Sequence, residues 1–241
     1  MPLLQAALNG DREHPALPRT PSELAAEARA AADAGARVLH LHPYDDDGRE
    51  TFEAEPCAAA VRAVHDACPG IPISFSTSAG IEADPERRLA LVAAWTELPE
   101  LVTANQGEEG IVDLCELLLE RGIGIEAGLL QLTDAQSFTA SGLAPRCVRA
   151  MVEPLGEDPE DALAEAAAIE ETLSEAGIGL EQVHHGDGIA SWAVNRRAAE
   201  RGHGIRTGLE DTPVLPDGSL ASGNGELVAA AASILAELAA G

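Results

Sequence analysis

The chain alternates strand-like apolar runs with helical stretches along its whole length, and this alternation limits the folds that it can adopt. The strand-like runs lie near residues 3–9, 37–43, 72–78, 101–106, 123–130, 147–153, 180–186 and 205–210. The helical stretches lie near residues 21–34, 55–67, 85–96, 110–121, 133–141, 158–176, 189–201 and 224–239. Strands separated by helices pair in parallel, and eight such units predict a single (β/α)8 barrel over residues 1–241. A doubly wound open sheet is the alternative, although no Gly-x-Gly-x-x-Gly follows the first strand.

The composition excludes several classes of protein. The formal net charge is −26, and all fifteen basic residues are arginine. Schiff-base aldolases, pyridoxal phosphate enzymes and P-loop nucleotide hydrolases each need a lysine, so the chain belongs to none of them. The acidity argues against nucleic acid and anionic membranes as partners. No apolar run approaches the ~20 residues that span a bilayer, no signal-peptide pattern is present, and the four cysteines lack metal-type spacing, so we expect a cytoplasmic protein.

Two histidines end the second strand-like run, in the segment Arg37-Val38-Leu39-His40-Leu41-His42. Residues two apart point to the same face of a strand, so the imidazoles of His40 and His42 leave one face together. Two histidines so arranged are half of a metal site, for which zinc is the commonest metal and another divalent ion an alternative. Two histidines packed in a core are the structural alternative.

The eighth run ends in acid, in the segment Ile205-Arg206-Thr207-Gly208-Leu209-Glu210-Asp211. Arg206, Gly208 and Glu210 share one parity, so we expect Glu210 to point where the histidines point. In a closed barrel strands two and eight flank strand one, and the chemistry lies at the C-terminal ends of the strands. His40, His42 and Glu210 therefore predict a metal site with an open fourth position. The structural alternative is that Glu210 and Asp211 lie in a solvated acidic turn.

Other strands carry polar residues of one parity, which we expect to face the barrel interior near the strand ends. These positions are Gln5 and Asn9, then Ser74, Ser76 and Ser78, then Thr103 and Asn105, and finally Glu126. Gly186-Asp187-Gly188 follows the seventh strand and fits either a ligand-facing backbone or a plain tight turn. By parity with Gly186 we expect His184 to line the pocket and His185 to pack outward.

Several segments resemble the β-keto acid cleavage enzyme family, typified by 3-keto-5-aminohexanoate cleavage enzyme. The combination of His-x-His with Arg-x-Gly-Leu-Glu-Asp carries most of this resemblance, and the other segments support it. The similar segments are Ala6-Ala7-Leu8-Asn9-Gly10, residues 35–42, Ser76-Thr77-Ser78-Ala79-Gly80, residues 202–211 and Ser222-Gly223-Asn224-Gly225-Glu226-Leu227-Val228.

The resemblance implies a (β/α)8 fold, a zinc ion held by His40, His42 and Glu210, and a condensation of a β-keto acid with acetyl-CoA that gives acetoacetate and a new CoA ester. It implies that Asp211 and Arg206 activate and position the reacting groups. It also implies that side chains at the strand ends contact the carboxylate and carbonyl groups of the substrate. The predicted substrate-binding residues are Asn9, Ser76, Ser78, Thr103, Asn105 and Glu126. We further expect a homo-oligomer.

The chemistry of the residues agrees with carbon–carbon bond cleavage. A divalent metal acts as a Lewis acid toward the keto oxygen of a β-keto acid, and so replaces the electron sink that a lysine supplies elsewhere. Asp211 beside the metal is suited to move a proton, and Arg206 to hold Asp211 ionised or to clamp a carboxylate. Two other functions remain open: a metal-dependent hydrolase or lyase that does not use CoA, and a non-catalytic barrel that binds a metal or a metabolite.

Overall fold

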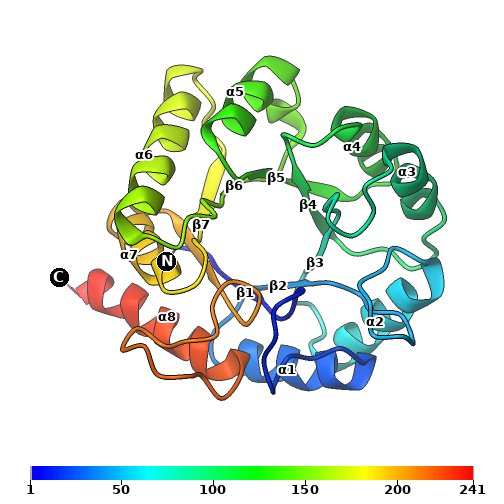
Figure 1. Cartoon of the computed structure of the whole chain (residues 1–241), viewed down its shortest axis with the longest axis horizontal. Coiled ribbons are helices and arrows are strands. Elements are labelled where there is room, and N and C mark those ends of the chain that lie inside the picture. Colours follow the sequence, from blue (N-terminus) through cyan, green and yellow to red (C-terminus); the bar gives the residue numbers. More distant parts are fainter. Residues whose placement is uncertain (1, 241) are drawn as a thin grey trace.

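A computed structural model describes residues 2–240 of the chain. Within this part, eight parallel strands close into a barrel in the order β1 to β8, with helices α1 to α8 around it (Figure 1). The strands are β1 Leu4–Ala7, β2 Val38–Leu41, β3 Ile73–Ser76, β4 Leu101–Asn105, β5 Gly124–Leu129, β6 Arg149–Val152, β7 Glu181–His184 and β8 Gly204–Thr207. The helices are α1 Pro21–Asp33, α2 Ala54–Ala67, α3 Pro85–Ala93, α4 Ile111–Glu120, α5 Leu132–Ser141, α6 Pro159–Glu175, α7 Ala190–Glu200 and α8 Asn224–Ala240. The predicted (β/α)8 fold is confirmed, and the open doubly wound sheet is wrong.

Local sequence explains where several helices begin. Thr20 caps α1 in a capping box with Glu23, and Pro21 takes the first helical position, where a missing N–H costs nothing. Asp84 and Asp158 cap α3 and α6 in the same manner, each accepting two backbone N–H groups just before a proline. These caps fix the points at which the chain leaves the barrel rim and turns down its outer wall.

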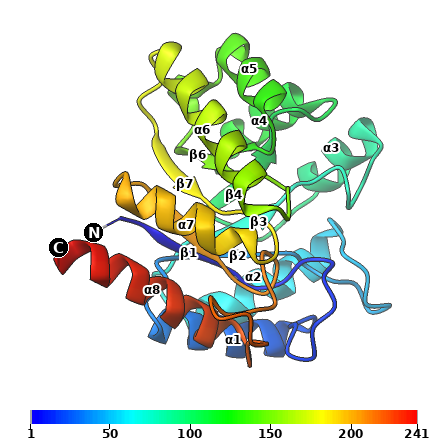
Figure 2. The same cartoon turned by 60° about the vertical axis from the view of Figure 1, so that its left-hand side comes forward.

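The apolar core lies between the strands and the surrounding helices. Outward-facing side chains such as Leu39 and Phe75 are fully buried there. Trp95 packs edge-on against Phe75, with 5.6 Å between ring centroids, and its Nε1 donates to the carbonyl of Phe52. The barrel interior instead holds polar side chains, so the two faces of the sheet have different chemistry. Helix α8 packs beside β1 at one side of the barrel (Figure 2).

The strands are shorter than their apolar runs. The eighth run is predicted to extend to residue 210, but β8 ends at Thr207, and the residues that follow form a turn. Strand parity therefore does not place Glu210, contrary to the prediction.

The four cysteines are buried and free. Within residues 2–240, no helix combines the length and the apolar character that a bilayer crossing requires.

Glu170 on α6 joins two arginines and a histidine at the α6–α7 contact. It accepts hydrogen bonds from Arg197 Nη2 at 2.8 Å and Arg201 Nη2 at 2.6 Å, and it lies 3.0 Å from His203 Nε2. Burial raises the pKa of Glu170, but these partners outweigh burial and lower the pKa to about 2.

We expect Glu170→Gln to lower the free energy of unfolding by about 1–3 kcal/mol at pH 7, because the three partners lose their carboxylate. The folded-state pKa of Glu170 lies below its ordinary value of 4.5. The stabilisation is therefore complete above pH 4.5 and is lost as the pH falls toward about 2. The difference between wild type and variant in urea unfolding should shrink below pH 4.5. Glu171→Gln, on the exposed face of α6, serves as the control; an equal loss there would contradict the assignment.

Candidate metal centre and active site

A polar cavity of about 250 Å³ opens at the C-terminal ends of the barrel strands. Its walls come from the ends of strands far apart in sequence, which meet because the barrel is closed. The residues that line it are Asp11, His40, His42, Ser76, Ser78, Thr103, Asn105, Leu130, Glu153, Leu155, His185, Gly186, Asp187, Arg206, Glu210 and Asp211. This is the end of the barrel at which the fold places chemistry.

His40, His42 and Glu210 converge in this cavity. The Nε2 atoms of His40 and His42 are 3.3 Å apart. Glu210 Oε2 lies 3.4 Å from His40 Nε2, and Glu210 Oε1 lies 3.4 Å from His42 Nε2. Donor atoms at about 2.0–2.1 Å from a tetrahedral zinc ion stand about 3.3–3.4 Å from one another. The two Nε2 atoms thus have the spacing that a tetrahedral divalent ion needs, and each lies 3.4 Å from a different oxygen of the Glu210 carboxylate.

Neighbouring side chains hold both imidazoles in one tautomer. Ser74 donates its hydroxyl hydrogen to the Glu126 carboxylate, so Ser74 Oγ is left to accept from His40 Nδ1 at 3.2 Å. His42 Nδ1 lies 2.5 Å from Glu50 Oε1, which has no hydrogen to give if ionised. In the neutral form of both rings the proton therefore belongs on Nδ1, and Nε2 directs its lone pair at the shared point. Such contacts to the remote nitrogen are typical of histidines that bind metals.

Glu126 lies at the base of this arrangement, fully buried inside the barrel. Arg149 Nη1 lies 3.2 Å from Glu126 Oε1, and Gln5 Nε2 donates to the same carboxylate at 3.2 Å. Thr103 Oγ1 donates to Glu126 Oε2 at 3.3 Å. A buried carboxylate is stable only when it is paired and hydrogen-bonded in this way.

The electrostatics of the three converging residues differ sharply. Burial holds the pKa of His40 well below its ordinary value of 6.5. Burial also lowers the pKa of His42, but the carboxylates of Glu210 and Glu50 outweigh it and raise the pKa to about 10. Burial raises the pKa of Glu210, yet Arg206 and the two histidines hold it well below 4.5. Glu210 is therefore an anion over the whole physiological pH range.

Arg206 and Asp211 form a buried ion pair beside the three converging residues. Arg206 Nη2 donates to Asp211 Oδ1 at 2.7 Å and to Glu210 Oε1 at 2.7 Å. Burial raises the pKa of Asp211, although Arg206 and His185 act in the opposite direction. His185 Nδ1 also lies 3.3 Å from Asp211 Oδ1. Oδ1 is thus the crowded oxygen of Asp211, and Oδ2 is the freer one.

A tight turn after β8 brings Glu210 and Asp211 to the cavity. The carbonyl of Gly208 accepts from the backbone N–H groups of Asp211 and Thr212. Gly208 packs directly on β1, because a Cβ there would lie 1.9 Å from the carbonyl oxygen of Ala7. The turn therefore approaches the barrel more closely than any larger residue would allow.

The predicted substrate-binding residues divide into two groups. Ser76, Ser78, Thr103 and Asn105 line the cavity with the three converging residues, Arg206 and Asp211. Asn9 and Glu126 do not line it. Asn9 is buried and braces His42, since its Oδ1 accepts from the His42 N–H at 2.8 Å and its Nδ2 donates to the carbonyl of the same residue. Its position is structural support beneath the site.

The prediction for the two histidines at the end of β7 is wrong. His184 packs outward and stacks on His203 with 4.8 Å between ring centroids, whereas His185 lines the cavity. On β7 the inward face is the one that Glu181 and His185 share, since Glu181 forms an ion pair with Arg149 in the barrel interior. Sequence reasoning also missed Glu50, Glu153 and the role of Ser74. Glu153 directly follows β6, so its polar character at a strand end was a signal that pointed to it.

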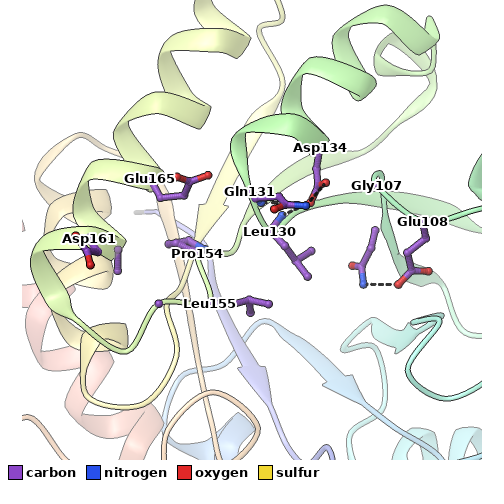
Figure 3. A pocket seen from close by; sticks show the side chains of 12 residues that line it. Gly107, Glu108, Leu130, Gln131, Asp134, Pro154, Leu155, Asp161 and Glu165 are labelled. Carbon is purple, nitrogen blue, oxygen red and sulfur yellow. Dashed lines mark hydrogen bonds between the residues drawn. The ribbon is translucent and has the colours of Figure 1, made fainter.

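A second, larger cavity of about 570 Å³ adjoins the first. Figure 3 shows it between the start of α5 and the start of α6, with Leu155 and Leu130 at one side and Glu108 at another. Asn105, Leu130 and Leu155 line both cavities. The two cavities therefore lie side by side at the mouth of the barrel.

The fold and the cavity define a (β/α)8 protein with a polar site at the C-terminal ends of its strands. The family described as beta-keto acid cleavage enzyme matches residues 3–240. The chain belongs to this family of enzymes, as the motifs of its sequence predicted.

Two relatives of the chain are named enzymes. The chain is 29% identical to 3-keto-5-aminohexanoate cleavage enzyme of Fusobacterium nucleatum over 98% of this chain and 92% of that protein. It is 28% identical to 3-oxoadipate:acetyl-CoA acetyltransferase of Cupriavidus necator, over 98% of this chain and 88% of that protein. These relatives are enzymes, and acetyl-CoA is named as a substrate of the second.

A solved structure shares the fold. ObcA, in a ternary complex with a C4-CoA adduct and oxalate, superposes with a TM-score of 0.76 at 18% identity. The alignment covers 93% of this chain and 64% of ObcA, so the chain spans less than two thirds of that protein. The similarity shows the common barrel.

The Gly208 turn leads to a prediction about stability. We expect Gly208→Ala to lower the free energy of unfolding by about 1–3 kcal/mol, because the added methyl group overlaps the Ala7 backbone. Urea unfolding measures the change. Gly179→Ala is the matched control, since a Cβ at Gly179 meets nothing within 4 Å. Equal stability of the two variants would show that the turn is not packed as described.

Proposed function

We propose that the protein is a metal-dependent β-keto acid cleavage enzyme that uses acetyl-CoA. In the overall reaction the bond between the keto carbon and the α-carbon of the keto acid breaks. The α-carbon becomes bonded to the acetyl group, giving acetoacetate, and the acyl remainder leaves as a CoA ester. The observation that carries this proposal is the convergence of His40, His42 and Glu210 beside the buried pair of Arg206 and Asp211.

The donor set fits a divalent ion, most simply zinc. Two imidazole nitrogens with directed lone pairs and one carboxylate lie at mutual distances of 3.3–3.4 Å. Among the described residues, the buried Glu210 Oε2 has no hydrogen-bond partner, so this oxygen is available to coordinate a cation. When bound there, zinc supplies Lewis acidity toward a carbonyl oxygen.

Asp211 is the proposed acid–base residue. Arg206 and His185 crowd Asp211 Oδ1, which leaves Oδ2 to take a proton from the substrate carbon next to the carbonyl and to return it later. The raised pKa of Asp211 makes its carboxylate a stronger base than an exposed aspartate. Arg206 positions this carboxylate through Nη2 and Nε and keeps it oriented during the proton transfer.

Strand-end hydroxyls are the proposed contacts for the substrate carboxylate. Ser76 and Ser78 lie on the β3 side of the cavity, and Thr103 lies on the neighbouring β4, with its Oγ1 3.4 Å from His40 Nδ1. Hydroxyls donate to a carboxylate without adding charge. The acidic surroundings make these neutral donors important, because few free cations remain for the purpose.

We expect purified protein to contain about one divalent metal ion per chain, and the double variant His40→Ala/His42→Ala to contain almost none. Elemental analysis gives the stoichiometry, and the rise in Tm on adding zinc to metal-free protein gives an independent readout. His65→Ala is the control, because His65 lies on the exposed side of α2 beside Glu100. Retention of metal by the double variant would contradict the site.

We expect acetoacetate to form from a β-keto acid only when acetyl-CoA is present, and Asp211→Asn to lower kcat by about 10²–10⁴-fold with unchanged metal content. A panel of β-keto acids, assayed with and without acetyl-CoA, measures both. Asp113→Asn, on the exposed face of α4, is the control. Keto acid consumption without acetyl-CoA would favour a hydrolase or lyase, and normal turnover by Asp211→Asn would remove its proposed role.

A further inference from the structure

Glu153 is a buried carboxylate that the proposed reaction does not use. It follows β6, is 7% exposed and lines the same cavity as His40, His42 and Glu210. Its Oε2 lies 3.1 Å from His185 Nε2. Its Oε1 is buried and has no hydrogen-bond partner anywhere in residues 2–240. A buried carboxylate oxygen without a donor indicates that a donor belongs there.

Asn105 brings a second acceptor to the same place. Its Nδ2 donates to Glu108 Oε1 at 2.9 Å, and that carboxylate is itself held by Arg88. A carboxylate accepts hydrogen bonds, so this contact fixes which end of the amide is nitrogen and turns Oδ1 the other way. A Cβ on Gly128 would lie 2.4 Å from Asn105 Oδ1 and 3.1 Å from Glu153 Oε1. Both oxygens therefore face one small region beside Gly128.

The charge of the cavity points to the kind of group that fits this region. Among the described residues, five carboxyl side chains and one arginine line the cavity. The arginine, Arg206, already pairs with Glu210 and Asp211. A second carboxylate on a substrate would meet like charge and two acceptors, whereas an ammonium or hydroxyl group would donate to both oxygens.

We propose that Glu153 and Asn105 form a specificity subsite for a hydrogen-bond donor, an ammonium or a hydroxyl group, at the far end of the keto acid. The proposal rests on the proposed function, because it takes the keto group to lie at His40, His42 and Glu210. Leu130 and Leu155 border the subsite where the two cavities join, and they cover the methylene groups between the keto carbon and the donor. A substrate that ends in a carboxylate is excluded.

The test compares four 3-oxopentanoates that differ only at carbon five, which is methyl, hydroxymethyl, aminomethyl or carboxylate. For wild-type protein we expect kcat/KM to be highest for the aminomethyl or hydroxymethyl acid and lowest for the dicarboxylate. In Glu153→Gln, the amide oxygen replaces Oε2 near His185, so a nitrogen replaces the unpaired oxygen and repels the donor. The ratio of the best donor substrate to the dicarboxylate should fall by about 10- to 100-fold.

Two further variants keep the test decisive. Asn105→Ala should shift the ratio in the same direction, and it stands in for Glu153→Gln if that variant does not fold. Glu157→Gln, an exposed carboxyl in the same loop, should leave the ratio unchanged. Loss of the aminomethyl acid alone assigns the preference to charge, and loss of both donor substrates assigns it to hydrogen bonding. Either outcome supports the subsite.

Calorimetric titration of metal-loaded protein with the same four acids, without acetyl-CoA, measures the ratio from binding alone. Absence of turnover with all four acids would therefore count against the proposed function. The subsite would still be supported or refuted by the ratio of binding affinities from calorimetry. An unchanged ratio in both Glu153→Gln and Asn105→Ala, or an equal shift in Glu157→Gln, would overturn the subsite.

Discussion

The buried carboxylate of Glu126 is the interaction on which the site depends. An ionised group inside a barrel is tolerated only with compensating charge and donors, and Arg149, Gln5, Thr103 and Ser74 supply them from four different strands. These contacts with Glu126 also determine the tautomer of His40 in the cavity. Because Ser74 gives its hydrogen to Glu126, its oxygen accepts from His40, and the lone pair of His40 Nε2 faces the cavity. The barrel interior therefore sets the protonation of a residue at its mouth.

The fold followed from the sequence because its signals repeat along the chain. Eight apolar runs, each followed by a helical stretch, leave few alternatives to a closed parallel barrel, and errors of a few residues at each boundary do not alter that result. Parity placed residues on β4 and β5 correctly: Thr103 faces the interior with Glu126, as their alternation predicts. It failed for His184 at the end of β7, because the inward face was assigned from Gly186, which lies beyond that strand. Parity is a property of extended backbone, and its reach ends where the strand ends.

Beyond the strand ends, the predicted side-chain positions were either wrong or right for a reason other than strand parity. Glu210 reaches the histidines, but it does so through the turn that begins at Gly208, where the chain leaves the strand and lies on the Ala7 backbone. His185, one residue past β7, was assigned to the wrong side. Glu50 contacts His42 from a loop that returns to it after Tyr44, and no local spacing in the sequence encodes that return. Contacts of this kind depend on tertiary packing of loops and so remain invisible to periodicity.

The acidity of the chain limits how such a site can hold anionic substrates. A net charge of −26 repels a keto acid and a CoA phosphate at long range, although salt screens most of that field beyond about 10 Å. Binding must then come from short-range contacts inside the cavity. Arg206 is neutralised by Asp211 and Glu210, so it contributes little free positive charge. In the proposed function, the remaining attraction for a keto acid would come from the strand-end hydroxyls and from a divalent cation held by His40, His42 and Glu210. Metal occupancy would then be a condition for substrate binding as well as for chemistry.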